Sequence, residues 1–138
     1  MKNPYYKVNR HSCFKLEYYL VVATKYRHPV LTEEITEYLK EIVNDVFKEH
    51  WNCTVISVNT DKDHIHILFE APPQVQLSKL INNFKTVSSR LVRKKFPEYL
   101  AKYYWKPYFW SMSYYIGSVS DTTEDVVKHY IETQGGRR

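Results

Sequence analysis

Two histidines inside an apolar run have the type and spacing of a metal half-site. His64 and His66 flank Ile65. Alternate side chains of a strand point to the same face, so the two imidazoles would lie about 7 Å apart along one face and could bind one ion. Two ordinary strand histidines, one solvated and one hydrogen-bonded, would give the same pattern. The motif alone leaves both interpretations open.

A tyrosine and a glutamine near the end of the chain could complete such a site. Tyr130 and Gln134 are one helical turn apart, so they would share a helix face and could both reach an ion held by His64 and His66. Imidazoles and a carboxamide oxygen with open positions suit Mg²⁺ or Mn²⁺ bound to phosphate rather than closed structural zinc. Attack by Tyr130 on a phosphodiester would give a phosphotyrosine link and a 3′ hydroxyl, which allows rejoining without a nucleotide cofactor.

Two other side chains could assist this chemistry. Asp61 and Asp63 come just before the histidine strand and could orient an imidazole or touch the ion. A hairpin turn also uses Asp for its own backbone hydrogen bonds, and the two interpretations have equal support. A phenol with a pKa of about 10 needs help to lose its proton, and the sequence does not identify the base.

Composition favours an anionic partner. The 138 residues have a net charge of +5 and are 43% hydrophobic, as in a globular protein. The candidate DNA-binding residues are Lys25, Arg27, Arg90, Arg93, Lys94 and Lys95. Residues 103–115 combine many aromatic rings with a basic side chain, and unpaired nucleobases stack on such surfaces. Aromatic rings also fill protein cores and subunit interfaces.

Several classes of protein are disfavoured. No stretch approaches the run of about 20 apolar residues that crosses a bilayer, and the N-terminus lacks the pattern of a signal peptide. A cytoplasmic protein that does not associate with a membrane is therefore expected. Cys13 and Cys53 have no metal-ligand spacing and are expected to be packed thiols.

The elements that must position these residues follow from hydrophobic periodicity. Strands are expected at 14–24, 54–60, 64–70 and 109–116, and long helices at 32–50 and 77–96, with a last helix capped by Ser120 or Asp121 after a Gly117-Ser118 hinge. This order is the split βαβ arrangement of a ferredoxin-like α+β fold, here a single domain over 1–138. Two helices would cover one face of the antiparallel sheet. His64 and His66 would lie on the other face, which the terminal helix carrying Tyr130 could cover.

Four segments in this order resemble the single-tyrosine transposases of the insertion-sequence 200/605 group, within the His-hydrophobic-His nucleases. They are Thr24–Leu31, Asp63–Leu68, Trp110-Ser111 before Tyr114-Tyr115, and Tyr130–Gln134. The chain departs from the pattern in two places. The strand at 18–22 lacks a histidine that many relatives carry, and Ser113 stands where glycine is common.

The resemblance implies a DNA transposase that cleaves and rejoins single-stranded DNA at insertion-sequence ends. His64, His66 and Gln134 would bind the divalent ion, and Tyr130 would form a 5′-phosphotyrosine intermediate. It also implies recognition of DNA hairpins by a homodimer in which the tyrosine helix of one subunit completes the metal site of the other. A domesticated relative acting on genomic hairpins fits the same residues.

Two rival functions remain. A non-catalytic ferredoxin-like module that binds single-stranded nucleic acid would explain fold, charge and aromatic content, but would not explain convergence of His64, His66 and Gln134. A metal-dependent phosphodiesterase using water would leave Tyr130 without a role. Metal binding and covalent adduct formation separate the three.

Overall fold

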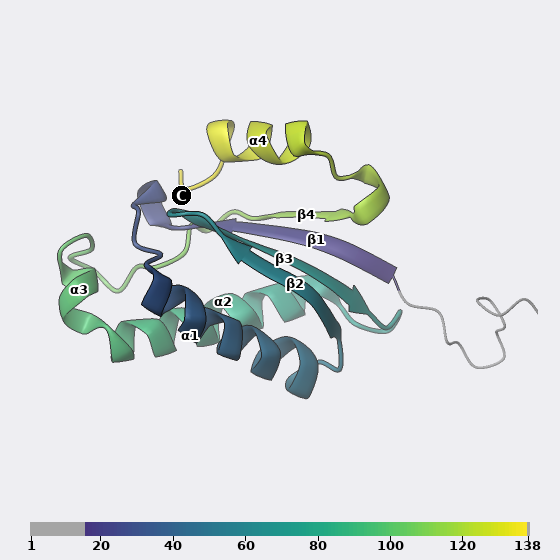
Figure 1. Cartoon of the computed structure of the whole chain (residues 1–138), viewed down its shortest axis with the longest axis horizontal. Coiled ribbons are helices and arrows are strands. Elements are labelled where there is room, and N and C mark those ends of the chain that lie inside the picture. Colours follow the sequence, from purple (N-terminus) through teal and green to yellow (C-terminus); the bar gives the residue numbers. More distant parts are fainter. Residues whose placement is uncertain (1–15, 138) are drawn as a thin grey trace, which may run out of the picture.

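One antiparallel sheet of four strands, in the order β2-β3-β1-β4, forms the centre of the computed structural model, which describes residues 16–137 (Figure 1). The strands are β1 (Leu16–Ala23), β2 (Thr54–Thr60), β3 (His64–Ala71) and β4 (Tyr115–Ser118). β3 lies between β1 and β2, which is the split βαβ order, so the predicted α+β class is confirmed. Residues 14–15 of the expected first strand, and Cys13, lie outside the described residues.

Two long helical segments cover one face of this sheet. Thr32 begins the first by accepting a hydrogen bond from the backbone N–H of Ile35 at 3.1 Å. Helix α1 (Glu33–Val43) continues as a π-helical segment, η2 (Asn44–His50), so the expected range 32–50 is helical from residue 33, with Thr32 as its cap. Helix α2 spans Leu77–Lys95, and Pro97 then starts a short helix not expected from the sequence, α3 (Pro97–Ala101).

The core lies between the sheet and these helices. Ile65, Ile67 and Phe69 of β3 are fully buried against it, together with Phe47 and Phe84 from the helical layer. Burying each such side chain contributes roughly 1.5–3 kcal/mol. Because side chains alternate along a strand, this burial turns His64 and His66 to the opposite face.

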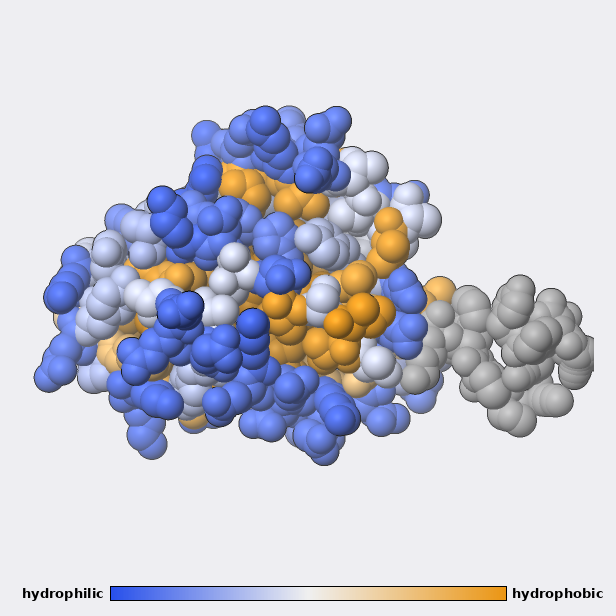
Figure 2. All heavy atoms as spheres, viewed as in Figure 1, coloured by the Kyte–Doolittle hydropathy of each residue, from blue (hydrophilic) through white to orange (hydrophobic). Residues whose placement is uncertain are grey.

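A third helix covers part of that opposite face. Helix α4 (Glu124–Thr133) crosses the sheet on the side away from α1 and α2 (Figure 1). Its outward side is hydrophilic and its sheet-facing side hydrophobic (Figure 2). Only Tyr130 and Ile131 of α4 are buried, in a small cluster with Val21 of β1. This helix is therefore held by a much smaller apolar contact than α1 or α2.

The expected strand at 109–116 is wrong in its start. Trp110 makes only an isolated bridge with Thr24, and regular pairing with β1 begins at Tyr115. The indole of Trp110 is buried in the core, where its N–H donates to Ser88 Oγ at 2.8 Å. After that bridge, the N–H of Ser111 donates to the carbonyl of Ala23 at 2.8 Å, and regular pairing is interrupted until Tyr115.

The expected cap and hinge are also corrected. Ser120 and Asp121 lie in a 3₁₀ turn, η3 (Val119–Asp121), and Thr123 caps α4 by accepting from the N–H of Val126 at 3.2 Å. Gly117 lies inside β4 rather than in a hinge. A Cβ there would clash with the Tyr115 ring, so glycine is required by close approach rather than by backbone freedom.

Candidate functional site

His64 and His66 line a cavity of about 700 Å³ between β3 and α4. Their ring centroids lie 4.6 Å apart. Arg27 lines the cavity from the loop after β1, and Val127 and Ile131 line it from α4. The structure thus joins three segments distant in sequence around the two imidazoles.

Each imidazole is held through its Nδ1 atom. Nδ1 of His64 lies 2.7 Å from Oδ1 of Asp63, and Nδ1 of His66 lies 2.7 Å from the hydroxyl of Tyr19. The Asp63 carboxylate accepts a hydrogen bond from Nδ1–H of His64, and the Tyr19 hydroxyl is able to accept one from Nδ1–H of His66. In that tautomer the lone pair is on Nε2. This arrangement, in which a side chain holds the ring nitrogen that does not bind metal, is typical of histidine ligands.

The charge state of His66 suits a ligand. Burial lowers its pKa to about 4; His64 contributes in the same direction, and Asp61 opposes both. The ring is therefore neutral at pH 7, the form that binds metal.

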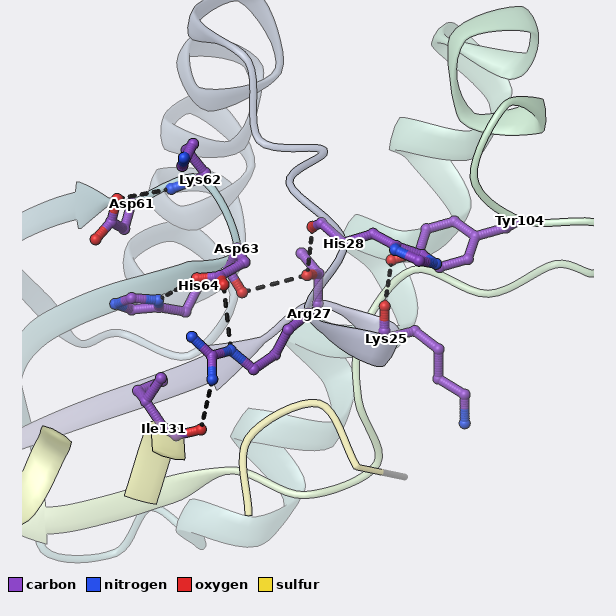
Figure 3. Close-up of polar contacts among 10 residues, drawn as sticks. Lys25, Arg27, His28, Asp61, Lys62, Asp63, His64, Tyr104 and Ile131 are labelled. Atoms are coloured by element: carbon purple, nitrogen blue, oxygen red, sulfur yellow. Dashed lines mark hydrogen bonds and ion pairs between the residues drawn. The ribbon is translucent and has the colours of Figure 1, made fainter. Parts of the chain in front are cut away.

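Arg27 holds the carboxylate that orients His64. Its Nε donates to Oδ2 of Asp63 at 3.2 Å, and its Nη1 donates to the carbonyl of Ile131 at 3.2 Å (Figure 3). Asp61 lines the same cavity, and its Oδ1 also accepts the backbone N–H of Lys62 at 2.9 Å in the hairpin turn. Asp63 thus contacts an imidazole directly, while Asp61 combines a turn contact with a place at the cavity.

Tyr130 and Gln134 do not reach the histidines within this chain. The Tyr130 ring is buried against Tyr115, and its hydroxyl lies 2.8 Å from Oγ of Ser113. Gln134 lies just past α4 with an exposed side chain, and its backbone N–H donates to the carbonyl of Tyr130 at 2.8 Å. Neither residue lines the cavity. The expected convergence of four side chains is therefore not formed inside one subunit.

The Tyr130 phenol is protonated at neutral pH. Burial raises its pKa, while the hydrogen bond with Ser113 acts in the opposite direction. This phenol needs a base or a metal ion to help it lose its proton before it can act as a nucleophile, and within residues 16–137 its hydroxyl is hydrogen-bonded to Ser113, which is not a base.

The histidine pair also lacks a third ligand of the usual acidic, thiol or imidazole type. Within residues 16–137, no group of three His, Cys, Asp or Glu side chains could hold a metal ion. A third ligand for an ion bound by His64 and His66 must therefore be of another type, such as a carboxamide, or come from outside residues 16–137.

The candidate DNA-binding residues lie on two different surfaces. Lys25 and Arg27 belong to the turn η1 (Lys25–Arg27) beside the cavity. Arg90, Arg93, Lys94 and Lys95 lie on α2, across the sheet from the histidines (Figure 1). Only the first group is near the site. Within the described residues, no helix combines the length and apolar content needed to cross a membrane.

Two residues of the site were not singled out from the sequence for their contacts. Tyr19 holds His66, and Ser113 holds Tyr130. The alternation of residues in the first strand gave a signal for Tyr19, because it places Tyr19 and Val21 on the same face. For Ser113, the signal in the sequence was that serine stands where glycine is common in the family that the chain resembles.

Comparison with known proteins gives a consistent family. The model of a family described as "Transposase IS200 like" matches residues 12–134. The ISDra2 transposase TnpA of Deinococcus radiodurans is 34% identical over 128 residues, which cover 93% of this chain and 90% of that protein. The IS200 transposase of Salmonella typhimurium is 29% identical over 125 residues, covering 88% and 81%.

Solved structures agree with this result. A crystal structure of a putative transposase from Deinococcus radiodurans has a TM-score of 0.82 and 33% identity, over 94% of this chain and 98% of the other. A REP-associated tyrosine transposase bound to a REP hairpin has a TM-score of 0.58 at 14% identity, over 85% and 66%. At that identity the second structure shows the shared fold alone.

Proposed function

This chain belongs to the IS200-like transposase family, and on that premise we propose that it cleaves and rejoins single-stranded DNA at insertion-sequence ends through a phosphotyrosine on Tyr130. His64, His66 and Gln134 bind a divalent ion, Mg²⁺ or Mn²⁺, in this proposal. The proposal rests on the hydrogen bonds of the two histidines. Nδ1 of His64 and Nδ1 of His66 each have a side-chain partner, which leaves the two Nε2 atoms for one ion at the cavity under α4.

The donor set fits such an ion. Two neutral imidazoles with oriented rings, and a carboxamide oxygen from Gln134, leave coordination positions open for phosphate oxygens and water. Bound there, the ion would supply polarisation of the scissile phosphate and offset the charge on its oxygens. Asp63 and Tyr19 keep the two rings in place.

The third ligand and the nucleophile come from a second copy of the chain in this proposal. Tyr130 lies against Ser113, and neither Tyr130 nor Gln134, which follows α4, lines the cavity of their own histidines. Two observations support exchange of α4 between subunits: the helix buries only Tyr130 and Ile131, and it follows a short connection after β4. An exchanged helix would bring Tyr130 and Gln134 together, one turn apart.

The covalent step uses the Tyr130 hydroxyl. Its oxygen forms a bond to phosphorus, the bond from phosphorus to O3′ breaks, and the 3′ oxygen leaves as a hydroxyl after taking up a proton. The phenolic proton passes to a base that the contacts of this chain do not supply. Attack by that 3′ hydroxyl, or another one, on the phosphotyrosine reverses the step and rejoins DNA.

A hairpin at the insertion-sequence end is the proposed recognition element. One neighbour with this fold was solved with a REP hairpin bound. The net charge of +5 is suited to a phosphate backbone. The basic face of α2 would contact the duplex stem in this proposal, because its residues lie apart from the site of cleavage.

The test is formation of a covalent protein–DNA species. Labelled single-stranded DNA from the ends flanking the gene is incubated with Mg²⁺ or Mn²⁺ and resolved on a denaturing protein gel. Wild type should give a shifted band that EDTA and Tyr130→Phe both abolish. Metal-dependent cleavage without an adduct would instead favour a phosphodiesterase using water, an alternative suggested by the separation of Tyr130 from the histidines.

A further inference from the structure

A row of aromatic rings, each near a lysine or another ring, runs from the turn η1 over the segment that follows α2. We propose that this row stacks unpaired bases of single-stranded DNA while its lysines contact the phosphates, an inference that rests on the proposed function. The "ring row" comprises Tyr26, His28, Tyr99, Tyr103 and Tyr108, with Trp105 in the same segment.

The rings are continuous. Ring centroids are 5.9 Å apart between Tyr26 and Tyr108, and 5.7 Å between Tyr26 and His28. The separation is 5.6 Å from His28 to Tyr103 and again from Tyr103 to Tyr99. All five are at least partly exposed, so the row is a surface rather than part of the core.

Two aromatic side chains extend well into solvent. Tyr26 is 52% exposed and Trp105 is 81% exposed. Large aromatic side chains cost free energy when left in water, and such patches commonly mark binding surfaces. A base has an apolar face that fits such a ring, whatever its sequence.

Lysine side chains lie beside the row and beside Trp105. Nζ of Lys25 lies 5.2 Å from the Tyr26 ring centroid and 4.8 Å from that of Tyr108. Nζ of Lys106 lies 4.8 Å from the Trp105 ring. Residues 24–29 and 99–108 contain no Asp or Glu. Rings interleaved with uncompensated positive charge complement single-stranded DNA, which offers both bases and phosphates.

The backbone that presents Tyr26 is strained yet firmly held. Tyr26 and Arg27 have φ values of 60° and 53°, in the left-handed region that side chains with a Cβ disfavour. The N–H of Tyr26 donates to the carbonyl of Gly136 at 2.9 Å, and the hydroxyl of Tyr104 donates to the carbonyl of Lys25 at 2.7 Å. Such strain persists where surrounding contacts over-determine it, most often at functional sites.

The ring row begins beside the histidine cavity. In Figure 3 the side chain of Arg27 points toward Asp63 and His64, while that of Lys25 points away from them, from the other end of the same turn. Tyr26 lies between these two residues. A DNA strand whose scissile phosphate lies at the histidines can therefore continue over Tyr26 and Lys25. Duplex DNA would not fit this use, because the faces of its bases are covered by stacking on the neighbouring base pairs.

The test compares two probes at equal phosphate charge. A labelled oligothymidylate of about 15 nucleotides, within the site sizes of single-strand binders, is matched with an abasic deoxyribose-phosphate oligomer of the same length. Binding of the full chain is measured by fluorescence anisotropy in EDTA, which prevents metal-dependent cleavage. Wild type should bind oligothymidylate more tightly than the abasic oligomer.

Single substitutions locate the binding. Tyr26→Ala, which removes the 52% exposed ring that joins Tyr108 to His28, should weaken binding of oligothymidylate about tenfold, or about 1.4 kcal/mol, and leave binding of the abasic oligomer nearly unchanged. Met112→Ala, which removes another highly exposed apolar side chain at 74%, should change neither. Lys25→Ala should weaken both probes and reduce the salt dependence, because it removes a phosphate contact.

A lysine outside the proposed DNA contacts serves as the control. Lys48 is exposed on η2, in the helical layer on the other face of the sheet. Lys48→Ala should bind both single-stranded probes like wild type. The proposal is overturned if Tyr26→Ala binds like wild type, if the two probes bind equally, or if Lys48→Ala weakens them more than Lys25→Ala. Failure of the adduct assay, with these binding results intact, would overturn the proposed function instead.

Discussion

The carboxylate of Asp63 fixes the ring of His64, with Oδ1 lying 2.7 Å from Nδ1. Its other oxygen, Oδ2, accepts a hydrogen bond from Arg27 at 3.2 Å, and the same guanidinium reaches the carbonyl of Ile131 in α4. One arginine therefore links the orientation of a proposed metal ligand to the helix that carries Tyr130. Changes at this contact should alter metal binding without removing a ligand.

Asp63→Asn is the direct test of that link. The amide cannot accept both hydrogen bonds as strongly as the carboxylate, so the His64 ring loses its preferred tautomer and orientation. Mn²⁺ affinity should fall about 10- to 100-fold, measured by isothermal titration calorimetry. Asp45→Asn, an exposed carboxylate on η2, is the control and should bind Mn²⁺ like wild type. Equal affinities for the two variants would exclude a role for Asp63 in positioning the ligand.

Exchange of α4 between subunits predicts complementation. Tyr130→Phe and a His64→Ala/His66→Ala variant should each fail to form the covalent DNA adduct. The two variants are mixed, partly unfolded and refolded together. Half of the dimers then contain one copy of each variant, and each of these has one complete site out of two, so roughly a quarter of the wild-type adduct should be recovered. A size tag on one variant identifies the modified subunit. Exchange requires the adduct on the His variant, which keeps Tyr130; no recovery at all would favour action within one chain.

The hydrogen bond between Ser113 and Tyr130 should show in a double-mutant cycle. Ser113→Ala and Tyr130→Phe each remove the same 2.8 Å contact, and each should lower the free energy of unfolding by about 0.5–1.5 kcal/mol. The double variant should lose little more than either single variant. Urea unfolding measures all four proteins. Strictly additive losses would mean that the two hydroxyl groups do not interact in solution.

Protonation of His66 predicts a pH dependence of stability in metal-free buffer. Burial lowers its pKa from 6.5 to about 4, so the folded state binds fewer protons than the unfolded state between these values. The free energy of unfolding is therefore not reduced by His66 above pH 6.5, and it decreases as the pH falls toward 4. From pH 7 to 4.5, wild type should lose about 1–2 kcal/mol more than His66→Gln, a value reduced because the ring is partly exposed. His129→Gln, an exposed histidine on α4, should follow wild type.

Local patterns determined much of the fold. Alternation around Ile65, Ile67 and Phe69 predicted which face of β3 meets the helices, and the periodicity of 32–50 and 77–96 predicted both long helices. These inferences succeed because side-chain direction along a strand or helix is set by the backbone of that same segment. The start of β4 was not predictable in this way, because Trp110 packs against residues of α2 far away in the sequence and pairs only at an isolated bridge, before the regular ladder.

The sequence by itself determined the residue types of the site, their order and the shared face of His64 and His66. Only the tertiary structure decided that Asp63 and Tyr19 hold those rings, that Arg27 joins Asp63 to α4, and that Tyr130 rests on Ser113 away from the cavity. The reason is physical. Tyr130 lies inside α4 and Gln134 just past its end, so their distance along the chain is local information. The packing of Tyr130 and Ile131 against Val21 of β1 and Tyr115 of β4 instead joins segments that are far apart in the sequence or belong to different elements.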